Sequence, residues 1–261
     1  MSPVDVLAIG AHPDDVELGC GATVARLARA GRRVGILHLT RGEAGSRGTP
    51  EERRREAERA AAILGAAELV FLDCGDGALR QGPAEEDALI DELRRLRPEL
   101  VLAPAPADRH PDHGRAHRLV VDACFYAGLG RRASGTPHRP AALFTYMQHD
   151  TFVPAFVVDV SATWAIKMAA LDAYGSQIFP GGGAAEAGEG PRTRAERSEP
   201  ATKVDRSGPA TKVASREFRL AVEGRARHYG NLIGAEFGEP FGSLGTLSVA
   251  DPWELLPRGL R

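Results

Sequence analysis

Short apolar runs alternate with helical segments along most of the chain, and this alternation constrains the fold more than any other feature. Each apolar run has the length of one buried β-strand, and most of the segments between them have helical spacing and end at Gly or Pro. A strand, a helix and a further strand in this order form a βαβ unit, which builds a parallel sheet with right-handed crossovers. The alternation therefore predicts an α/β fold, Rossmann-like, with a mostly parallel sheet flanked by helices.

The predicted elements follow from these runs. The expected strands are 4–10, 33–39, 69–72, 100–103, 141–146 and 156–159, and the expected helices are 18–30, 51–64, 84–97, 116–126 and 215–231. Gly31, Gly65 and Pro98 mark the ends of the first three helices. The segment from residue 237 onward is rich in Gly and Pro, and no element is predicted there.

Length alone leaves one domain or two open, and 43% hydrophobic residues suffice for a core. We expect a single domain over residues 1–261, because too little chain follows residue 213 to build a second core. From 180 to 213 the composition shifts to Gly, Ala, Pro, Arg, Glu and Thr, with the near-duplicate PATKV at 200–204 and 209–213. Such a segment buries too little apolar surface to offset the entropy of ordering it. We therefore expect residues 180–213 to be a mobile insertion within that domain.

Charge, cysteine count and hydropathy restrict the partners and the compartment. A formal net charge of −2 argues against a nucleic-acid or anionic-membrane binder, which normally carries a basic face. The three cysteines lack CxxC spacing, which fits a reducing compartment rather than a disulfide framework. Neither a signal-peptide pattern nor a run of about 18 apolar residues is present. We expect a cytoplasmic protein whose partner is a small molecule.

Two clusters rich in His and Asp carry the chemistry. Ala-His-Pro-Asp-Asp occupies 11–15, after the first predicted strand, and Arg-His-Pro-Asp-His occupies 109–113, after the fourth. Ligands of open α/β sheets bind in the crevice at the carboxyl ends of the strands, so the two clusters are expected to form one site. Either cluster alone is also explained by helix capping at Asp14 or Asp15 and by polar loop histidines.

The clusters contain a catalytic metal set. His12, Asp15 and His113 supply two imidazoles and one carboxylate, a zinc set that leaves one position open for water. We expect one Zn²⁺ per chain, although iron, cobalt or manganese accept the same ligands. His117, four residues after His113, is an alternative ligand, but it lacks the Glu of an HExxH motif.

The remaining polar residues of the clusters match the other needs of metal-assisted amide hydrolysis. Asp14 lies between two predicted ligands and is the expected general base. His110 would stabilise the oxyanion or protonate the leaving group, and Asp112 would orient a histidine.

Residues 11–23, AHPDDVELGCGAT, and residues 109–117, RHPDHGRAH, resemble the two motifs of the LmbE-like, or PIG-L, family of zinc-dependent N-acetylglucosamine deacetylases. The resemblance implies the same roles as the chemistry of the residues: metal ligands at His12, Asp15 and His113, the general base at Asp14, and stabilisation of the tetrahedral intermediate at His110. It covers the chain except for 180–213.

Further segments resemble the bacillithiol-biosynthesis branch of that family, which removes acetate from N-acetylglucosaminyl malate. They are TRGE at 40–43, GTP at 48–50, Arg53 with Glu56, FLDCGD at 71–76, AYGSQ at 173–177 and GEPF at 238–241. Asp108 stands where mycothiol-pathway relatives carry a tyrosine, which is a departure from that other branch.

The branch resemblance also implies substrate contacts and an assembly. The implied substrate-binding residues are Arg53, Asp73, Arg109 and Glu43, with Arg41 and Arg47 as further candidates. Arginine suits a malate conjugate because its guanidinium binds a carboxylate through two parallel hydrogen bonds. Relatives in this branch form hexamers, so the resemblance implies a homo-oligomer.

The resulting hypothesis is a hydrolase that removes acetate from the N-acetylglucosaminyl group of a small conjugate, with N-acetylglucosaminyl malate as the expected substrate. One alternative keeps the site and changes the substrate to a mycothiol-type conjugate, free N-acetylglucosamine or a chitooligosaccharide. The other is a non-enzymatic, Rossmann-like sugar- or nucleotide-binding module. Only the enzyme hypotheses require a stoichiometric metal and loss of function with a chelator.

Overall fold

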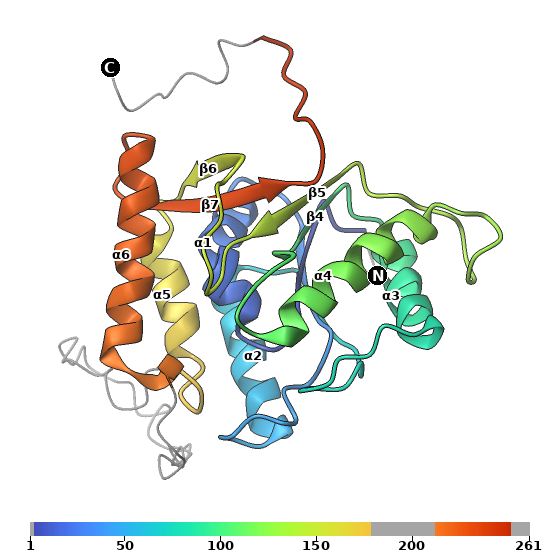
Figure 1. The fold of residues 1–261 in the computed structure, drawn as a ribbon, viewed down its shortest axis with the longest axis horizontal. Helices are drawn as coiled ribbons and strands as arrows, with labels where there is room; N and C mark the ends of the chain where they lie inside the picture. The colour runs from blue at the N-terminus through green and yellow to red at the C-terminus, as the bar shows by residue number, and fades with distance from the viewer. Residues whose placement is uncertain (1–2, 179–211, 252–261) are drawn as a thin grey trace, which may run out of the picture.

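The computed structural model describes residues 3–178 and 212–251 (Figure 1). It contains a seven-stranded sheet of order β3-β2-β1-β4-β5-β7-β6. The strands are β1 (Val6–Gly10), β2 (Val34–His38), β3 (Glu68–Phe71), β4 (Leu100–Pro104), β5 (Ala142–Tyr146), β6 (Phe156–Asp159) and β7 (Gly238–Ser243). Strands β1 to β5 pair in parallel, and β7 lies antiparallel between β5 and β6. The predicted α/β class with a mostly parallel sheet is confirmed.

Helices cover both faces of this sheet. They are α1 (Asp15–Arg29), α2 (Pro50–Leu64), α3 (Pro83–Leu96), α4 (Pro111–Ala127), α5 (Trp164–Asp172) and α6 (Arg216–Leu232), with a 3-10 helix at Lys212–Ala214. One core cluster joins the sheet to α1, α2, α5 and α6, and the other joins it to α3 and α4. Alternate residues of β1 enter different clusters, because side chains alternate across a strand. No helix in the described part of the chain is long and apolar enough to cross a membrane.

Helix α4 begins five residues before the predicted helix, which started at residue 116. Pro111 occupies the first helical position, where a missing N–H carries no penalty. His110 caps the helix, since its Nδ1 accepts a hydrogen bond from the Asp112 backbone N–H at 3.2 Å. Residues 111–113 of the second His and Asp cluster therefore lie in the first turn of a helix.

One α-helix, α5, and one strand, β7, were not predicted. Helix α5 is apolar around most of its circumference and so lacks the two-sided pattern that marks a surface helix. Strand β7 contains two glycines and Pro240, which disfavour a strand, yet it pairs on both sides within the sheet. Tertiary contacts outweigh local preference in both cases. The predicted mobile insertion at 180–213 lies outside the described residues except for its last two positions.

Helix α1 is interrupted at Cys20, whose φ of −142° is not helical. Glu239 on β7 accepts hydrogen bonds from the two backbone N–H groups after the break, Ala22 at 3.2 Å and Thr23 at 2.7 Å. Lys167 on α5 contacts the same carboxylate at 2.6 Å, and both side chains are buried. The GEPF segment of the sequence thus caps the second half of a helix more than 200 residues earlier.

Candidate active site

The two clusters meet at the carboxyl ends of β1 and β4, where the strand order changes direction. From β1 the chain proceeds to β2 and β3 on one side of the sheet, and β4 then adds on the other side. This is the switch point at which open α/β sheets bind ligands. The ring centroid of His12 lies 4.8 Å from that of His110 and 5.6 Å from that of His113. Residues about 100 positions apart thus form one cluster.

Asp15 lies between the two histidines that were predicted as metal ligands. Its Oδ2 is 3.4 Å from His12 Nδ1, and its Oδ1 is 3.2 Å from His113 Nε2. These distances run to different oxygens of Asp15, so its carboxylate lies between the two rings. Two imidazoles and a carboxylate are donors that suit a divalent cation. His110 can join these donors, because His12, His110 and His113 each have one ring nitrogen within 4.8 Å of the others.

Carboxylates face the other ring nitrogens of both histidines. His12 Nε2 lies 3.1 Å from Asp76 Oδ1 and 3.4 Å from Asp112 Oδ2, and His113 Nδ1 lies 3.0 Å from Asp108 Oδ1. Metal-binding histidines commonly have such a partner, which fixes the ring and raises its basicity. Asp112 occupies the predicted orienting position. Asp76 and Asp108 were not predicted to contact the site.

This arrangement concentrates negative charge around two imidazoles. Burial alone would lower the pKa of His113, but the carboxylates of Asp15 and Asp108 raise it to about 9. Burial likewise opposes protonation of His12, yet its hydrogen bonds, first of all to Asp112, raise its pKa well above the usual value. The site therefore favours a positive charge, either protons or a cation.

Asp14 occupies the N-cap position of α1 but its side chain makes no capping hydrogen bond. Its φ of 101° lies in the left-handed region, which costs a non-glycine residue of the order of 1–2 kcal/mol. Burial raises the pKa of the carboxyl to about 7, and Arg53, 3.7 Å away, lowers it. Simple helix capping does not account for this residue, and its pKa suits a general base.

Arg53, predicted to bind substrate, is only 4% exposed. Its guanidinium donates to the Gly42 carbonyl at 2.9 Å and to the Pro13 carbonyl at 2.8 Å. Gly42 has a φ of +70°, and a Cβ there would lie 2.2 Å from Arg53 Nη1. Arg53 therefore connects the loop after β2 to the backbone beside Asp14.

His110 presents one ring nitrogen to the site. Its Nδ1 accepts the Asp112 backbone N–H, so the neutral ring carries its hydrogen on Nε2. Burial, followed by the charges of His12 and His113, lowers the pKa of His110 and favours this neutral form. The residue is thus a hydrogen-bond donor, as oxyanion stabilisation requires.

The other predicted substrate residues lie at the rim. Glu43 accepts hydrogen bonds from the backbone N–H groups of Arg41 and Asp76, both at 3.0 Å. Asp73 is exposed and pairs with Arg41 at 3.1 Å. Arg109 is exposed and lines a pocket next to the site. Glu43 thereby joins the loop after β2 to the one after β3.

Gln148 and His149, which follow β5, also belong to the site and were not predicted. The Gln148 side chain donates to Asp15 Oδ1, and the His149 backbone N–H donates to Asp108 Oδ2 at 2.9 Å. The His149 ring stacks on His113 with centroids 5.8 Å apart. The strand-end rule, applied to β5 as it was to β1 and β4, would have found this pair.

Comparison with known proteins identifies the family. Residues 7–124 match the PIG-L family model, described as GlcNAc-PI de-N-acetylase. The diacetylchitobiose deacetylase of Thermococcus kodakarensis is 34% identical over 193 residues, which cover 67% of this chain and 70% of that enzyme. The chain belongs to the PIG-L family.

A further deacetylase and a solved structure are also similar to this chain. The 2'-N-acetylparomamine deacetylase of Streptomyces fradiae is 30% identical over 207 residues, covering 66% of this PIG-L chain and 72% of that protein. The conserved protein TT1542 from Thermus thermophilus superposes with a TM-score of 0.78 at 38% identity, over 95% of this chain and 98% of that one. The predicted family is confirmed, whereas the bacillithiol branch stays a prediction.

This PIG-L chain uses its later segments to fix the loops around the site. Ser176 donates from its backbone N–H and its hydroxyl to the Glu56 carboxylate, at 2.8 and 2.6 Å. Gln177 donates from Nε2 to the Arg47 carbonyl at 2.5 Å. The AYGSQ segment therefore connects α2 and the glycine-rich loop before it to the region after α5. Its contacts are structural.

Proposed function

We propose that this PIG-L chain is a metal-dependent hydrolase that removes the acetyl group from an N-acetylglucosamine unit of a small conjugate. The observation that carries the proposal is the placement of Asp14. It is a half-buried carboxyl on strained backbone, 3.7 Å from Arg53 and adjacent in sequence to Asp15, which lies between two histidines. A base beside a metal set is the combination that hydrolysis of an unactivated amide needs.

His12, Asp15 and His113 would hold the cation, and zinc suits their N and O donors. Bound there, a divalent cation would polarise the acetamide carbonyl and lower the pKa of a bound water from about 15.7 toward about 7. Asp76, Asp108 and Asp112, which contact the outer ring nitrogens, orient the histidines for this task.

The protein groups account for the proton movements. Asp14 accepts a proton from the water that attacks the acetyl carbon. His110 donates a hydrogen bond from its Nε2–H to the acetyl oxygen as negative charge develops there, and it keeps its proton. The C–N bond then breaks, the amine takes the proton that Asp14 received, and the products are acetate and a free amino sugar. Arg53 keeps Asp14 in position in two ways: it donates a hydrogen bond to the Pro13 carbonyl, and it forms an ion pair with the Asp14 carboxylate.

Asp14→Asn tests this assignment. The variant should retain its stoichiometric metal, measured by elemental analysis, while acetate release falls at least about 100-fold, as expected for the loss of a general base. Unchanged turnover would exclude Asp14 as the base. Treatment with a chelator should remove activity and zinc should restore it, whereas a non-enzymatic binding module predicts neither effect.

We propose N-acetylglucosaminyl malate as the first substrate to test, with Glu43, Asp73 and Arg109 as rim residues that contact the conjugate. A mycothiol-type conjugate, free N-acetylglucosamine and a chitooligosaccharide are the alternatives. The diacetylchitobiose deacetylase relative gives the last of these support. Side-by-side acetate release decides among them, and faster hydrolysis of the free sugar would overturn the malate proposal. Light scattering tests the expected homo-oligomer.

A further inference from the structure

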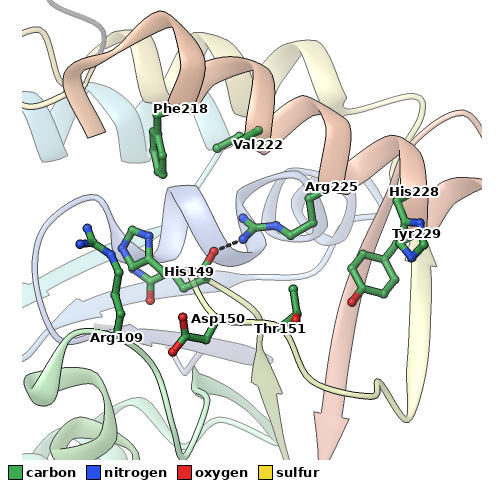
Figure 2. A pocket seen from close by; sticks show the side chains of 11 residues that line it. Arg109, His149, Asp150, Thr151, Phe218, Val222, Arg225, His228 and Tyr229 are labelled. Atoms are coloured by element: carbon green, nitrogen blue, oxygen red, sulfur yellow. Dashed lines mark hydrogen bonds between the residues drawn. The ribbon is translucent and has the colours of Figure 1, made fainter. Parts of the chain in front are cut away.

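A pocket of about 480 Å³ adjoins the candidate active site (Figure 2). One wall is the segment that follows β5, and another is helix α6. The residues that define its character are Arg109, His149, Phe218, Val222, Arg225 and Tyr229. None of them has been given a role in the chemistry at Asp14.

The pocket shares residues with the site. Gln148 donates its side-chain amide to Asp15, and its backbone carbonyl accepts the hydrogen bond from Arg225 that Figure 2 marks with a dashed line. His149 lines the pocket and stacks on His113. A group linked to a sugar whose acetamide lies at Asp14 is therefore within reach of this pocket.

Arg225 interrupts an apolar face of α6. Phe218, Val222 and Tyr229 are 8%, 3% and 6% exposed, and they follow helical spacing along one side. Arg225, three residues after Val222 and four before Tyr229, lies on that same side and points toward His149 (Figure 2). A cation placed among apolar side chains loses hydration, which is costly unless an anion meets it.

The neighbouring arginines of α6 have acidic partners. Arg219 pairs with Asp172 at 2.6 Å, and Arg227 pairs with Glu223 at 2.9 Å. Arg225 donates to the Gln148 carbonyl, and no carboxylate within residues 3–178 and 212–251 forms an ion pair with it. Its remaining N–H groups are a fork suited to a carboxylate or phosphate.

We propose that this pocket binds the group attached to the amino sugar, and that Arg225 selects substrates in which this group carries a carboxylate or phosphate. The proposal rests on the proposed deacetylase function and adds to it the chemical class of the conjugate. Arg109 adds a second positive charge, against Asp150, the one acid among the described residues that line the pocket. Phe218 and Tyr229 provide apolar walls that exclude water from the ion pair.

The test compares wild type, Arg225→Gln and the matched control Arg227→Gln, an exposed arginine two residues along the same helix that does not line the pocket. The substrates are N-acetylglucosaminyl malate, N-acetylglucosamine 1-phosphate and the neutral methyl N-acetylglucosaminide. Arg225→Gln should lower the ratio of kcat/KM for the anionic over the neutral substrate about 10- to 100-fold, the range for hydrogen bonds to a charged group. The Arg227→Gln ratio should match wild type. An Arg225→Gln ratio equal to that of wild type overturns the proposal.

Comparing N-acetylglucosaminyl malate with N-acetylglucosamine 1-phosphate identifies the anion. Arg225→Gln should lower kcat/KM more for the conjugate whose anion the arginine binds. Binding of malate and of inorganic phosphate to the zinc-loaded protein, measured by calorimetry, tests the pocket without turnover. Whichever anion binds wild type more tightly should bind Arg225→Gln at least tenfold more weakly. Equal affinity for wild type and Arg225→Gln overturns the proposal. If wild type hydrolyses none of the three substrates, the proposed function fails while this binding result still stands. Arg225→Lys, which keeps the charge and loses the fork, replaces the Gln variant if that variant does not fold.

Discussion

Replacing Lys167 with methionine should lower the free energy of unfolding by about 3 kcal/mol. Removal of one partner from a buried ion pair costs about 3–5 kcal/mol, and Lys167 and Glu239 are 4% and 3% exposed in their side chains. Lys167 Nζ also donates to the Leu18 carbonyl at 2.8 Å, so that acceptor loses its partner as well. Two backbone N–H groups still bind Glu239 in the variant, which places the expected cost at the lower end of the range. Methionine preserves most of the volume, so little of the cost comes from a cavity.

The assay is guanidinium denaturation followed by fluorescence of the single variants Lys167→Met and Glu239→Gln and of the double variant Lys167→Met/Glu239→Gln. Because the second change removes the unpaired charge, the double variant should regain at least about 1.5 kcal/mol, which a double-mutant cycle reports as coupling. Arg54→Met is the surface control. Its ion pair with Glu58 is 63% and 52% exposed, and its loss should cost less than about 1 kcal/mol. A cost for Lys167→Met no larger than this control, or strict additivity in the double variant, would refute the reasoning.

Two further predictions concern packing and the site. Gly19→Ala should destabilise the protein by about 1–3 kcal/mol, although Ala ordinarily favours a helix, because a Cβ there would lie 2.1 Å from the Tyr146 ring. Gly21→Ala in the same helix meets its nearest atom at 3.5 Å and should be neutral or stabilising, and thermal melts of the two compare them. Asp108→Asn should weaken metal affinity about 10- to 100-fold in a chelator competition, through loss of its contact with His113, whereas the exposed Asp73→Asn should not.

The parallel half of the fold was predictable because its signals are local. Strands buried on both faces are continuous apolar runs, and β2 and β4 were predicted to within one residue at each end. Helix ends at Gly65 and near Pro98 followed from residues that stop a helix. The strand-end rule then brought His12 and His113 together, since it depends only on strand order and direction.

The rest depends on contacts that no local pattern records. Glu239 accepts hydrogen bonds from backbone N–H groups 216 and 217 positions away. Only the assembled structure shows that α1 is interrupted just before the N–H groups that Glu239 caps. Asp76 and Asp108 occur in segments that also look like ordinary polar loops, and their contacts with the histidine rings follow from how those loops fold over the strand ends. Arg53 stands among three consecutive arginines and was selected by its spacing to Glu56, whereas its burial and its contacts with two backbone carbonyls appear only in the structure.

The left-handed backbone at Asp14 implies a conflict between thermal stability and the proposed catalytic activity. Glycine adopts this conformation without a steric penalty, so a sequence chosen for thermal resistance alone would place glycine there. Aspartate at this position carries the steric cost and makes no side-chain capping hydrogen bond in return. Engineering for heat resistance by stability scores alone would therefore select against the side chain that we propose as the general base.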